Sequence, residues 1–294
     1  MTKAPTDSSS TAVVVDGKAI ADDIRSHIAD EVSALVESGH RPPHLTVVIV
    51  GDDPASLSYI KGKQRACKRV GFTSAEEHLS ADTDMETLLS LLHDLNEDDG
   101  VDGILVQLPL PKGLSANAVA LAIDPAKDVD GLHPVNAGRL MAGQPGLYAC
   151  TPLGIMEVLD RHKVNLEGAQ AVVIGRSNIV GKPISMLLQQ RHATVTMCHS
   201  RTRDIAALCR EADVIVAATG VARMVKADWV RPGAAVIDVG VSVIDGKLVG
   251  DIDLEGVSTV ASLVTPPRGG VGPLTITMLL KNTLQAYRDR KGLL

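Results

Sequence analysis

The sequence predicts an α/β protein of two lobes, and three observations lead to that prediction. From Val13 onward, short runs of Val and Ile alternate with amphipathic segments, the pattern of βα units around a parallel sheet. The chain has 294 residues, and at ~150 residues per domain this is enough for one large or two ordinary domains. Aromatic residues are only 2% of the chain beside 45% hydrophobic residues, so the core must be aliphatic.

Composition excludes several classes of partner. The net charge of −6 argues against a nucleic-acid or membrane-surface protein, because those partners require a concentrated cationic face. The few aromatic residues also leave little for stacking on single-stranded nucleic acid. We therefore expect a small-molecule partner, no nucleic acid and no membrane.

The cysteines and the N-terminus bear on cofactors and location. The four cysteines lie far apart with no C-x-x-C spacing, which predicts neither a metal site nor a disulfide framework and fits a reducing, cytoplasmic location. Residues 1–11 have no apolar core for a signal peptide and read as a disordered tail. No later run has the ~18 apolar residues of a membrane span.

In the first half, apolar residues at spacings of four and three predict a helix with one apolar stripe. They are Ile20, Ile24, Ile28, Val32 and Leu35. Residues 45–50 read as a buried strand, and Asp53 and Pro54 are suited to begin a helix that ends before Gly71. Residues 103–106 form the next predicted strand.

In the second half, four strands with helices between them are expected at residues 171–174, 194–198, 213–217 and 234–239. The Gly- and Pro-containing stretch 127–152 is the expected crossing between the lobes. A last helix near Pro273 is expected to pack on the first lobe. The predicted domains are therefore residues 1–150, completed by helix 273–294, and residues 151–272.

Residues 171–183, AVVIGRSNIVGKP, predict a nucleotide site in a Rossmann-like second lobe. The order is strand, glycine turn and helix start, with G-R-S-x-x-x-G in place of G-x-G-x-x-G. Gly175 permits the turn, Gly181 permits close approach, and the exposed amides at the helix start favour a phosphate. The alternative is a structural glycine turn with solvated arginines.

Residues after the strand 194–198 favour NADP over NAD as the cofactor. At this strand end an acidic residue usually binds the ribose 2′-hydroxyl, but Ser200 and Arg201 stand here instead, and Arg176 adds a cation. A hydroxyl and guanidinium groups suit a 2′-phosphate. The turns at 217–220 and 238–241 are further strand ends that can line the same site.

In the first lobe, Tyr59 and Lys63 are four residues apart and share one face of the helix after strand 45–50. A lysine in a partly dry cleft has a lowered pKa and exchanges protons near neutral pH, although such a pair is also common on ordinary surface. Gln107 follows a buried strand, where α/β sites are built. Asp128 and Asp130 offer two carboxylates in a tight turn that also suits caps.

Taken in order, these segments resemble the bifunctional methylenetetrahydrofolate dehydrogenase/methenyltetrahydrofolate cyclohydrolase family, from about Val15 to Tyr287. The motifs are Tyr59-x-x-x-Lys63, VQLPLP at 106–111, KDVDGL at 127–132, CTP at 150–152, GRSxIVGxP at 175–183 and GGVGP at 269–273. The last of these belongs to the stiff loop 265–273, for which a simple helix lead-in is the alternative.

The resemblance implies NADP-dependent oxidation of 5,10-methylenetetrahydrofolate to the methenyl cation, followed by hydrolysis to 10-formyltetrahydrofolate. It also implies a cytoplasmic homodimer of one-carbon metabolism, serving purine biosynthesis, with a folate cleft between the two lobes.

By position in the motifs, the resemblance implies that Lys63 is the catalytic lysine, Gln107 its polar partner, Tyr59 the residue packing on the folate ring and Asp130 the carboxylate holding the pterin. The implied cofactor contacts are Gly175, Arg176, Ser177, Ser200, Arg201 and Val241, and the further substrate contacts are Gly269, Gly270 and Pro273.

One loop departs from the family pattern. Pro267 and Arg268 stand where relatives generally have Val and Pro, so Arg268 either meets a carboxylate of the folate tail or faces solvent. Two rival functions remain open. One is a dehydrogenase without the hydrolase step, and the other is a non-catalytic binding protein that would have lost Lys63 or Asp130, both of which are present.

Overall fold

The computed structural model describes residues 12–293, apart from the side chains of residues 54–59, and the chain divides into two compact units. Unit 1 contains residues 12–18 and Ile155–Gly272, and unit 2 contains Ala19–Gly154 and the segment from Pro273 onward. Both units are α/β with parallel sheets, which confirms the predicted fold class.

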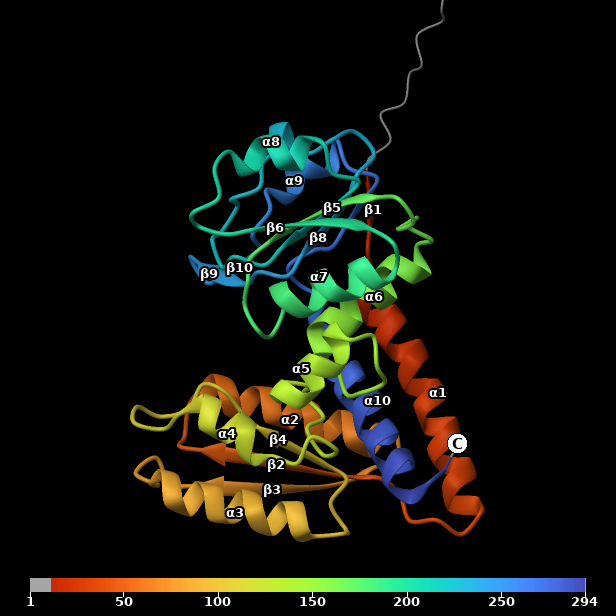
Figure 1. Ribbon diagram of the computed structural model, residues 1–294, viewed down its shortest axis with the longest axis vertical. Coiled ribbons are helices and arrows are strands. Elements are labelled where there is room, and N and C mark those ends of the chain that lie inside the picture. The colour runs from red at the N-terminus through yellow and green to blue at the C-terminus, as the bar shows by residue number, and fades with distance from the viewer. Residues whose placement is uncertain (1–11, 294) are drawn as a thin grey trace, which may run out of the picture. The chain divides into compact units, whose positions relative to one another are not determined.

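Unit 2 is built on a three-stranded parallel sheet of order β3-β2-β4 (Figure 1). Its strands are β2 (His44–Val50), β3 (Thr73–Leu79) and β4 (Gly103–Val106). The predicted strands β2 and β4 are confirmed. β3 was not predicted, because its sequence TSAEEHL is polar and its side chains are at least partly exposed throughout.

Several helices belong to unit 2, and α3 and α4 bury apolar side chains on this sheet. The helices are most of α1 (Gly17–Glu37), α2 (Pro54–Arg69), α3 (Met85–Glu97), α4 (Ala116–Ala122), α5 (Pro134–Met141) and α10 (Gly272–Lys291). Leu88 and Leu92 of α3 and Val119 of α4 pack on Val48 and Ile104 of the sheet. The predicted first and last helices are confirmed, and α10 from Pro273 onward belongs to unit 2.

The stretch 127–152, expected as the crossing between the lobes, contains regular structure. It carries helix α5, and Lys127 at its start is only 1% exposed. The chain instead passes from unit 2 to unit 1 inside helix α6 (Cys150–Arg161), between Gly154 and Ile155. Glycine and proline in this stretch lie at turns and at the start of α5.

Unit 1 is a six-stranded parallel sheet of order β1-β11-β8-β7-β5-β6. The strands are β1 (Val13–Val14), β5 (Gln170–Ile174), β6 (Thr194–Cys198), β7 (Val214–Ala217), β8 (Ala235–Asp238) and β11 (Leu263–Val264). The four predicted strands correspond to β5 to β8. A small antiparallel hairpin of β9 (Ser242–Ile244) and β10 (Lys247–Val249), also not predicted, follows β8.

Helices cover both faces of this sheet. In Figure 1, α8 (Ile205–Arg210) and α9 (Leu254–Ser258) lie on one face and α7 (Gly181–Gln190) on the other. The core against α8 and α9 is aliphatic, as expected, and includes Val172, Ile215 and Val236. The four cysteines are free and buried.

Two further features are absent from the described residues. No helix within residues 12–293 is long and apolar enough to cross a membrane. In the same range, no three His, Cys, Asp or Glu side chains are grouped so that they could hold a metal ion.

Candidate active site and nucleotide edge

Unit 2 places a buried lysine beside a glutamine at the carboxyl ends of β2 and β4. Lys63 lies on α2, the helix that follows β2, and is only 7% exposed. Its Nζ donates a hydrogen bond of 2.8 Å to Oε1 of Gln107, the residue directly after β4. Nε2 of Gln107 donates to the Leu108 carbonyl at 2.6 Å, which fixes the amide with its oxygen toward the lysine. The structure thus brings together this pair, which is 44 residues apart in sequence.

The electrostatics of this pair involve Asp130. Burial lowers the pKa of Lys63, and the negative charge of Asp130 is the largest influence acting against this shift. Burial also raises the pKa of Asp130, and the positive charge of Lys63 is the first influence that opposes it. Both shifts move toward neutral pH, which is the condition that acid/base catalysis requires.

The turn that carries Asp130 is anchored by Lys127. The Lys127 ammonium donates three hydrogen bonds to backbone carbonyls at the C-terminal end of α3. The acceptors are Leu95 at 2.9 Å, Asn96 at 2.7 Å and Asp98 at 2.7 Å. A cation suits this position, because the last carbonyls of a helix lack partners within it. Lys127 therefore has a structural role: it holds this turn against the end of α3.

The second carboxylate of the turn, Asp128, is also structural. It accepts hydrogen bonds from the backbone amides of Leu132 (3.2 Å) and His133 (2.7 Å) and from Nδ2 of Asn136 (2.9 Å). His133 accepts from the amide of Val135 and caps the start of α5. Asp130, by contrast, is the carboxylate whose charge acts on the pKa of Lys63.

Two residues near Asp130 were not predicted as part of this site. The Cys150 thiol donates to the Val129 carbonyl at 3.3 Å and is hydrogen-bonded to Asp130, and burial raises its pKa well above the ordinary value. Nδ2 of Asn282 on α10 donates to the carbonyls of Val129 (2.9 Å) and Tyr148 (2.8 Å). Cys150 could have been found through its CTP motif. No local pattern points to Asn282, which lies 153 residues from Val129.

Tyr59 stands one turn before Lys63 on the backbone of α2. Its side chain lies outside the described part of the structure, so packing of this ring on a ligand stays a prediction.

The carboxyl edge of the unit 1 sheet has a backbone shape that only glycine allows. Gly175, after β5, has φ of 128°, and a Cβ there would meet the Ala218 carbonyl oxygen at 2.3 Å. A Cβ on Gly181, at the start of α7, would meet the Gly175 oxygen at 2.2 Å. Ser177 Oγ accepts from the amides of Val180 and Gly181. A bare turn leading to a helix N-terminus fits a diphosphate group.

The other predicted cofactor residues lie at the same edge. Arg176 follows β5, Ser200 and Arg201 follow β6, and all three side chains are exposed. Val241, after β8, is 57% exposed. These strand ends carry two guanidinium groups and a hydroxyl, and such groups suit a 2′-phosphate, so the residues present fit NADP.

The glycine loop 265–273 ends unit 1. A Cβ on Gly270 would meet the Pro266 oxygen at 2.3 Å, and a Cβ on Gly17 would meet the Gly270 oxygen at 1.8 Å, so this loop packs closely on the start of α1. Gly269 has φ of 80°, which requires glycine. Arg268 is exposed. Pro273, the first residue of the next unit 2 segment, accepts a hydrogen bond from Arg25 at 3.0 Å.

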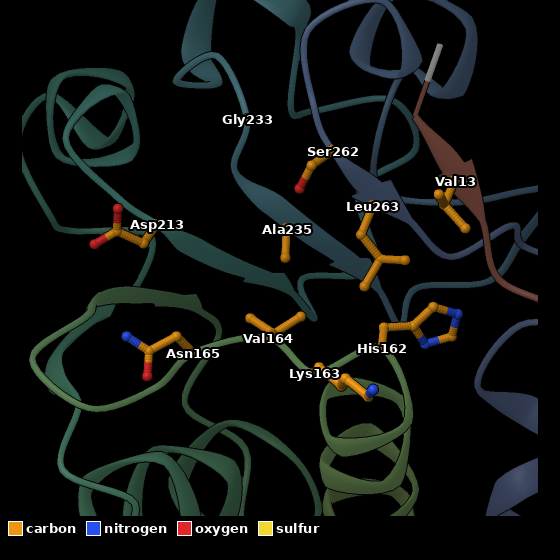
Figure 2. Close-up of a pocket in the computed structure, with 10 residues that line it drawn as sticks. All are labelled: Val13, His162, Lys163, Val164, Asn165, Asp213, Gly233, Ala235, Ser262 and Leu263. Atoms are coloured by element: carbon orange, nitrogen blue, oxygen red, sulfur yellow. The ribbon is translucent and has the colours of Figure 1, made fainter. Parts of the chain in front are cut away.

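A hollow of about 370 Å³ lies at the opposite edge of the unit 1 sheet (Figure 2). Its lining includes Val13, Asp213, Ala235 and Leu263, which lie at the beginning of four neighbouring parallel strands or just before them. Ligands of open α/β sheets bind outside the carboxyl ends of the strands. This hollow is therefore distinct from the nucleotide edge.

Two family models match the chain. One, described as "Tetrahydrofolate dehydrogenase/cyclohydrolase, catalytic domain", matches residues 15–130. The other, "Tetrahydrofolate dehydrogenase/cyclohydrolase, NAD(P)-binding domain", matches residues 149–291. Among curated relatives, the Bifunctional protein FolD of Halothermothrix orenii is 52% identical over 277 residues, covering 94% of this chain and 98% of the relative.

Solved structures agree with these matches. The bifunctional FolD methylenetetrahydrofolate dehydrogenase/cyclohydrolase of Campylobacter jejuni is 43% identical with a TM-score of 0.93, covering 95% of this chain and 99% of that one. The FolD enzyme of Trypanosoma brucei, solved with NADP cofactor and inhibitor, is 38% identical with a TM-score of 0.90, covering 95% and 98%. The chain belongs to the tetrahydrofolate dehydrogenase/cyclohydrolase family.

Proposed function

We propose that this chain is a bifunctional enzyme that oxidises 5,10-methylenetetrahydrofolate with NADP and hydrolyses the methenyl product to 10-formyltetrahydrofolate. The observation that carries the proposal is the buried Lys63 ammonium, hydrogen-bonded to Gln107 at 2.8 Å beside a carboxyl group whose pKa is raised. Family membership supports both activities.

In the oxidation step the chain acts mainly by binding and orientation. The cofactor supplies a hydride acceptor, and hydride transfer depends chiefly on holding the two reacting carbons in contact. We assign Gly175, Gly181 and Ser177 to the diphosphate cradle, and Arg176, Ser200 and Arg201 to the 2′-phosphate. These residues do no acid/base work.

In the hydrolysis step protons have to move. Water adds to the methenyl carbon and loses a proton, and a ring nitrogen takes up a proton as its bond to that carbon breaks. Lys63, with a pKa lowered by burial, accepts and returns such a proton near neutral pH, and Gln107 holds its Nζ in place. The Asp130 carboxylate accepts hydrogen bonds, which suits the donor-rich edge of a pterin.

The test is to follow the absorbance of methenyltetrahydrofolate and of NADPH together on the purified protein. The bifunctional enzyme forms NADPH while methenyltetrahydrofolate stays low, because it is hydrolysed as it forms. A dehydrogenase without the second step accumulates methenyltetrahydrofolate at the rate of NADPH formation. A binding protein without turnover gives neither signal, and either of these results contradicts the proposal.

We also propose a cytoplasmic homodimer that supplies 10-formyltetrahydrofolate to purine biosynthesis. The β9–β10 hairpin supports self-association, because Val243 is 69% and Leu248 is 46% exposed, and a second copy would cover these side chains. Light scattering at micromolar concentration should give twice the chain mass of 30.9 kDa, and Val243→Asp should lower it. A monomer mass for the unaltered protein contradicts the dimer.

A further inference from the structure

Two buried carboxylates at the carboxyl edge of the unit 1 sheet take no part in the functions above. Asp238 ends β8 and is 3% exposed, and Asp251 follows β10 and is fully buried. Oδ2 of Asp251 accepts hydrogen bonds from the amide and hydroxyl of Thr219 and from the amide of Gly220. Asp251 therefore holds the turn that follows β7.

Asp238 and Asp251 are packed tightly under the neighbouring turn. Asp238 accepts from the amides of Gly240 (3.1 Å), Asp251 (2.9 Å) and Ile252 (3.2 Å). A Cβ on Gly240 would lie 1.9 Å from Oδ1 of Asp251, and a Cβ on Gly250 would lie 1.7 Å from Oδ2 of Asp238. Only glycine lets the backbone come this close to the two carboxylates.

The negative charge of these carboxylates is not balanced by a cation. No basic side chain within residues 12–293 forms an ion pair with either one, and Oδ1 of Asp251 is buried without a hydrogen-bond partner. Burial and the nearby Asp251 raise the pKa of Asp238 to about 6, against three opposing backbone hydrogen bonds. At pH 8 Asp238 is thus ionised. Uncompensated buried charge is costly to a fold, and such groups occur disproportionately at functional sites.

The strand order places these carboxylates at one particular end of a bound dinucleotide. In the order β8-β7-β5-β6, the glycine turn after β5 takes the diphosphate and the residues after β6 take the adenosine ribose. The nicotinamide end must then extend the other way, over β7 and β8. The turns held by Asp251 and Asp238 follow those two strands.

The oxidised nicotinamide ring carries a positive charge, and the reduced ring is neutral. We propose that Asp251, supported by Asp238, determines which oxidation state of the cofactor is bound: its buried negative charge favours NADP⁺ over NADPH. This inference rests on the proposed NADP site and assigns Asp251 a role in cofactor selection in addition to holding the turn.

The test is the variant Asp251→Asn, with dissociation constants of NADP⁺ and NADPH measured by calorimetry at pH 8. Asparagine keeps an oxygen for the three Thr219 and Gly220 donors, places its amide where Oδ1 has no partner, and removes the charge. The NADP⁺ constant should rise on the order of tenfold, as for one unit charge at roughly 10 Å and an effective dielectric near 20. The NADPH constant should change much less.

Asp228→Asn is the matched control, because it removes the same charge from an exposed side chain in the same unit. It should leave the ratio of the two constants unchanged. Asp238→Asn provides a second variant if Asp251→Asn does not fold, and it should shift the ratio in the same direction.

The outcomes separate this inference from the function on which it rests. A lowered preference for NADP⁺ in Asp251→Asn, with the control unchanged, supports it. If NADP⁺ and NADPH both bind more weakly by the same factor, Asp251 only supports the fold. If neither dissociation constant changes, the charge of Asp251 does not act on the nicotinamide ring. Either result overturns the inference and leaves the proposed NADP site in place. Failure of the unaltered protein to bind NADP⁺ or NADPH overturns the proposed function itself.

Discussion

Replacing Lys63 with Met should remove the hydrolysis step and leave ligand binding largely intact. Methionine has nearly the length of lysine and fills the same buried space, but it has no amine. The 2.8 Å hydrogen bond to Gln107 is lost and no group remains to relay the proton. Positioned acid/base groups contribute about 10²–10⁴-fold, so the kcat of the cyclohydrolase reaction should fall by that factor. This corresponds to an increase of about 3–5 kcal/mol in its activation free energy.

The same variant makes a second, pH-dependent prediction through Asp130. Lys63 lowers the pKa of Asp130 against the raising effect of burial, so without the lysine this pKa rises further. In the proposed site, the ionised carboxylate of Asp130 accepts hydrogen bonds from the pterin through both oxygens, whereas the protonated form is a weaker acceptor and adds an O–H donor. Folate affinity should therefore be present above this pKa and be lost as pH falls through it, and Lys63→Met should move that loss to higher pH.

The assay measures methenyltetrahydrofolate hydrolysis by absorbance, folate KM from pH 5 to 9, and NADP binding by calorimetry. Lys61→Met is the matched control, because Lys61 lies on the same helix with its side chain exposed. Unchanged hydrolysis in Lys63→Met, or an equal loss in Lys61→Met, would refute the assignment of Lys63 as the proton relay.

Three further variants test other parts of the structure. Lys127→Met leaves three carbonyls at the end of α3 without their donor, one of them in a buried hydrogen bond and two in partly buried ones. It should lower the free energy of unfolding in urea by on the order of 3 kcal/mol, whereas a change under about 1 kcal/mol would contradict its anchoring role. Gly181→Ala places a Cβ 2.2 Å from the Gly175 oxygen and should weaken NADP binding by calorimetry, with unaltered affinity counting against the diphosphate cradle. The unaltered protein should strongly prefer NADP to NAD. Ser200→Asp should reduce that preference, because a carboxylate repels the 2′-phosphate and binds a free ribose hydroxyl. Equal kcat/KM values for both cofactors in the unaltered protein would reject the 2′-phosphate assignment.

Local pattern predicted the regular elements that are strongly apolar. β2 and β4 are nearly continuous aliphatic runs, and the apolar residues from Ile20 to Leu35 recur with the period of a helix. The pattern within each of these segments therefore indicates which of its side chains are buried. β3 was not predicted, because it is an edge strand with a polar sequence. β1 and β11 are each two residues long and are strands only because they pair with other strands of the unit 1 sheet, so their own sequence carries no strand pattern.

The pairing of Lys63 with Gln107 follows from a general rule that the sequence alone can use. Both stand after neighbouring parallel strands, and the carboxyl ends of such strands share one edge. The rule does not distinguish the two carboxylates of residues 127–131. That distinction depends on which one meets backbone donors, and Asp128 meets three.

By itself, the sequence determined that the core is aliphatic, that the chain is α/β with a tight glycine turn after β5, and which motifs are the candidates for the chemistry, because these properties belong to short segments. Only the tertiary structure decided that Lys63 is buried and that Asn282 holds the backbone next to Asp130 from 153 residues away. The same holds for Asp238 and Asp251, which lie together without a cation. A pKa and an unbalanced charge depend on which groups surround a side chain in space, and that environment is assembled from segments that no local pattern relates.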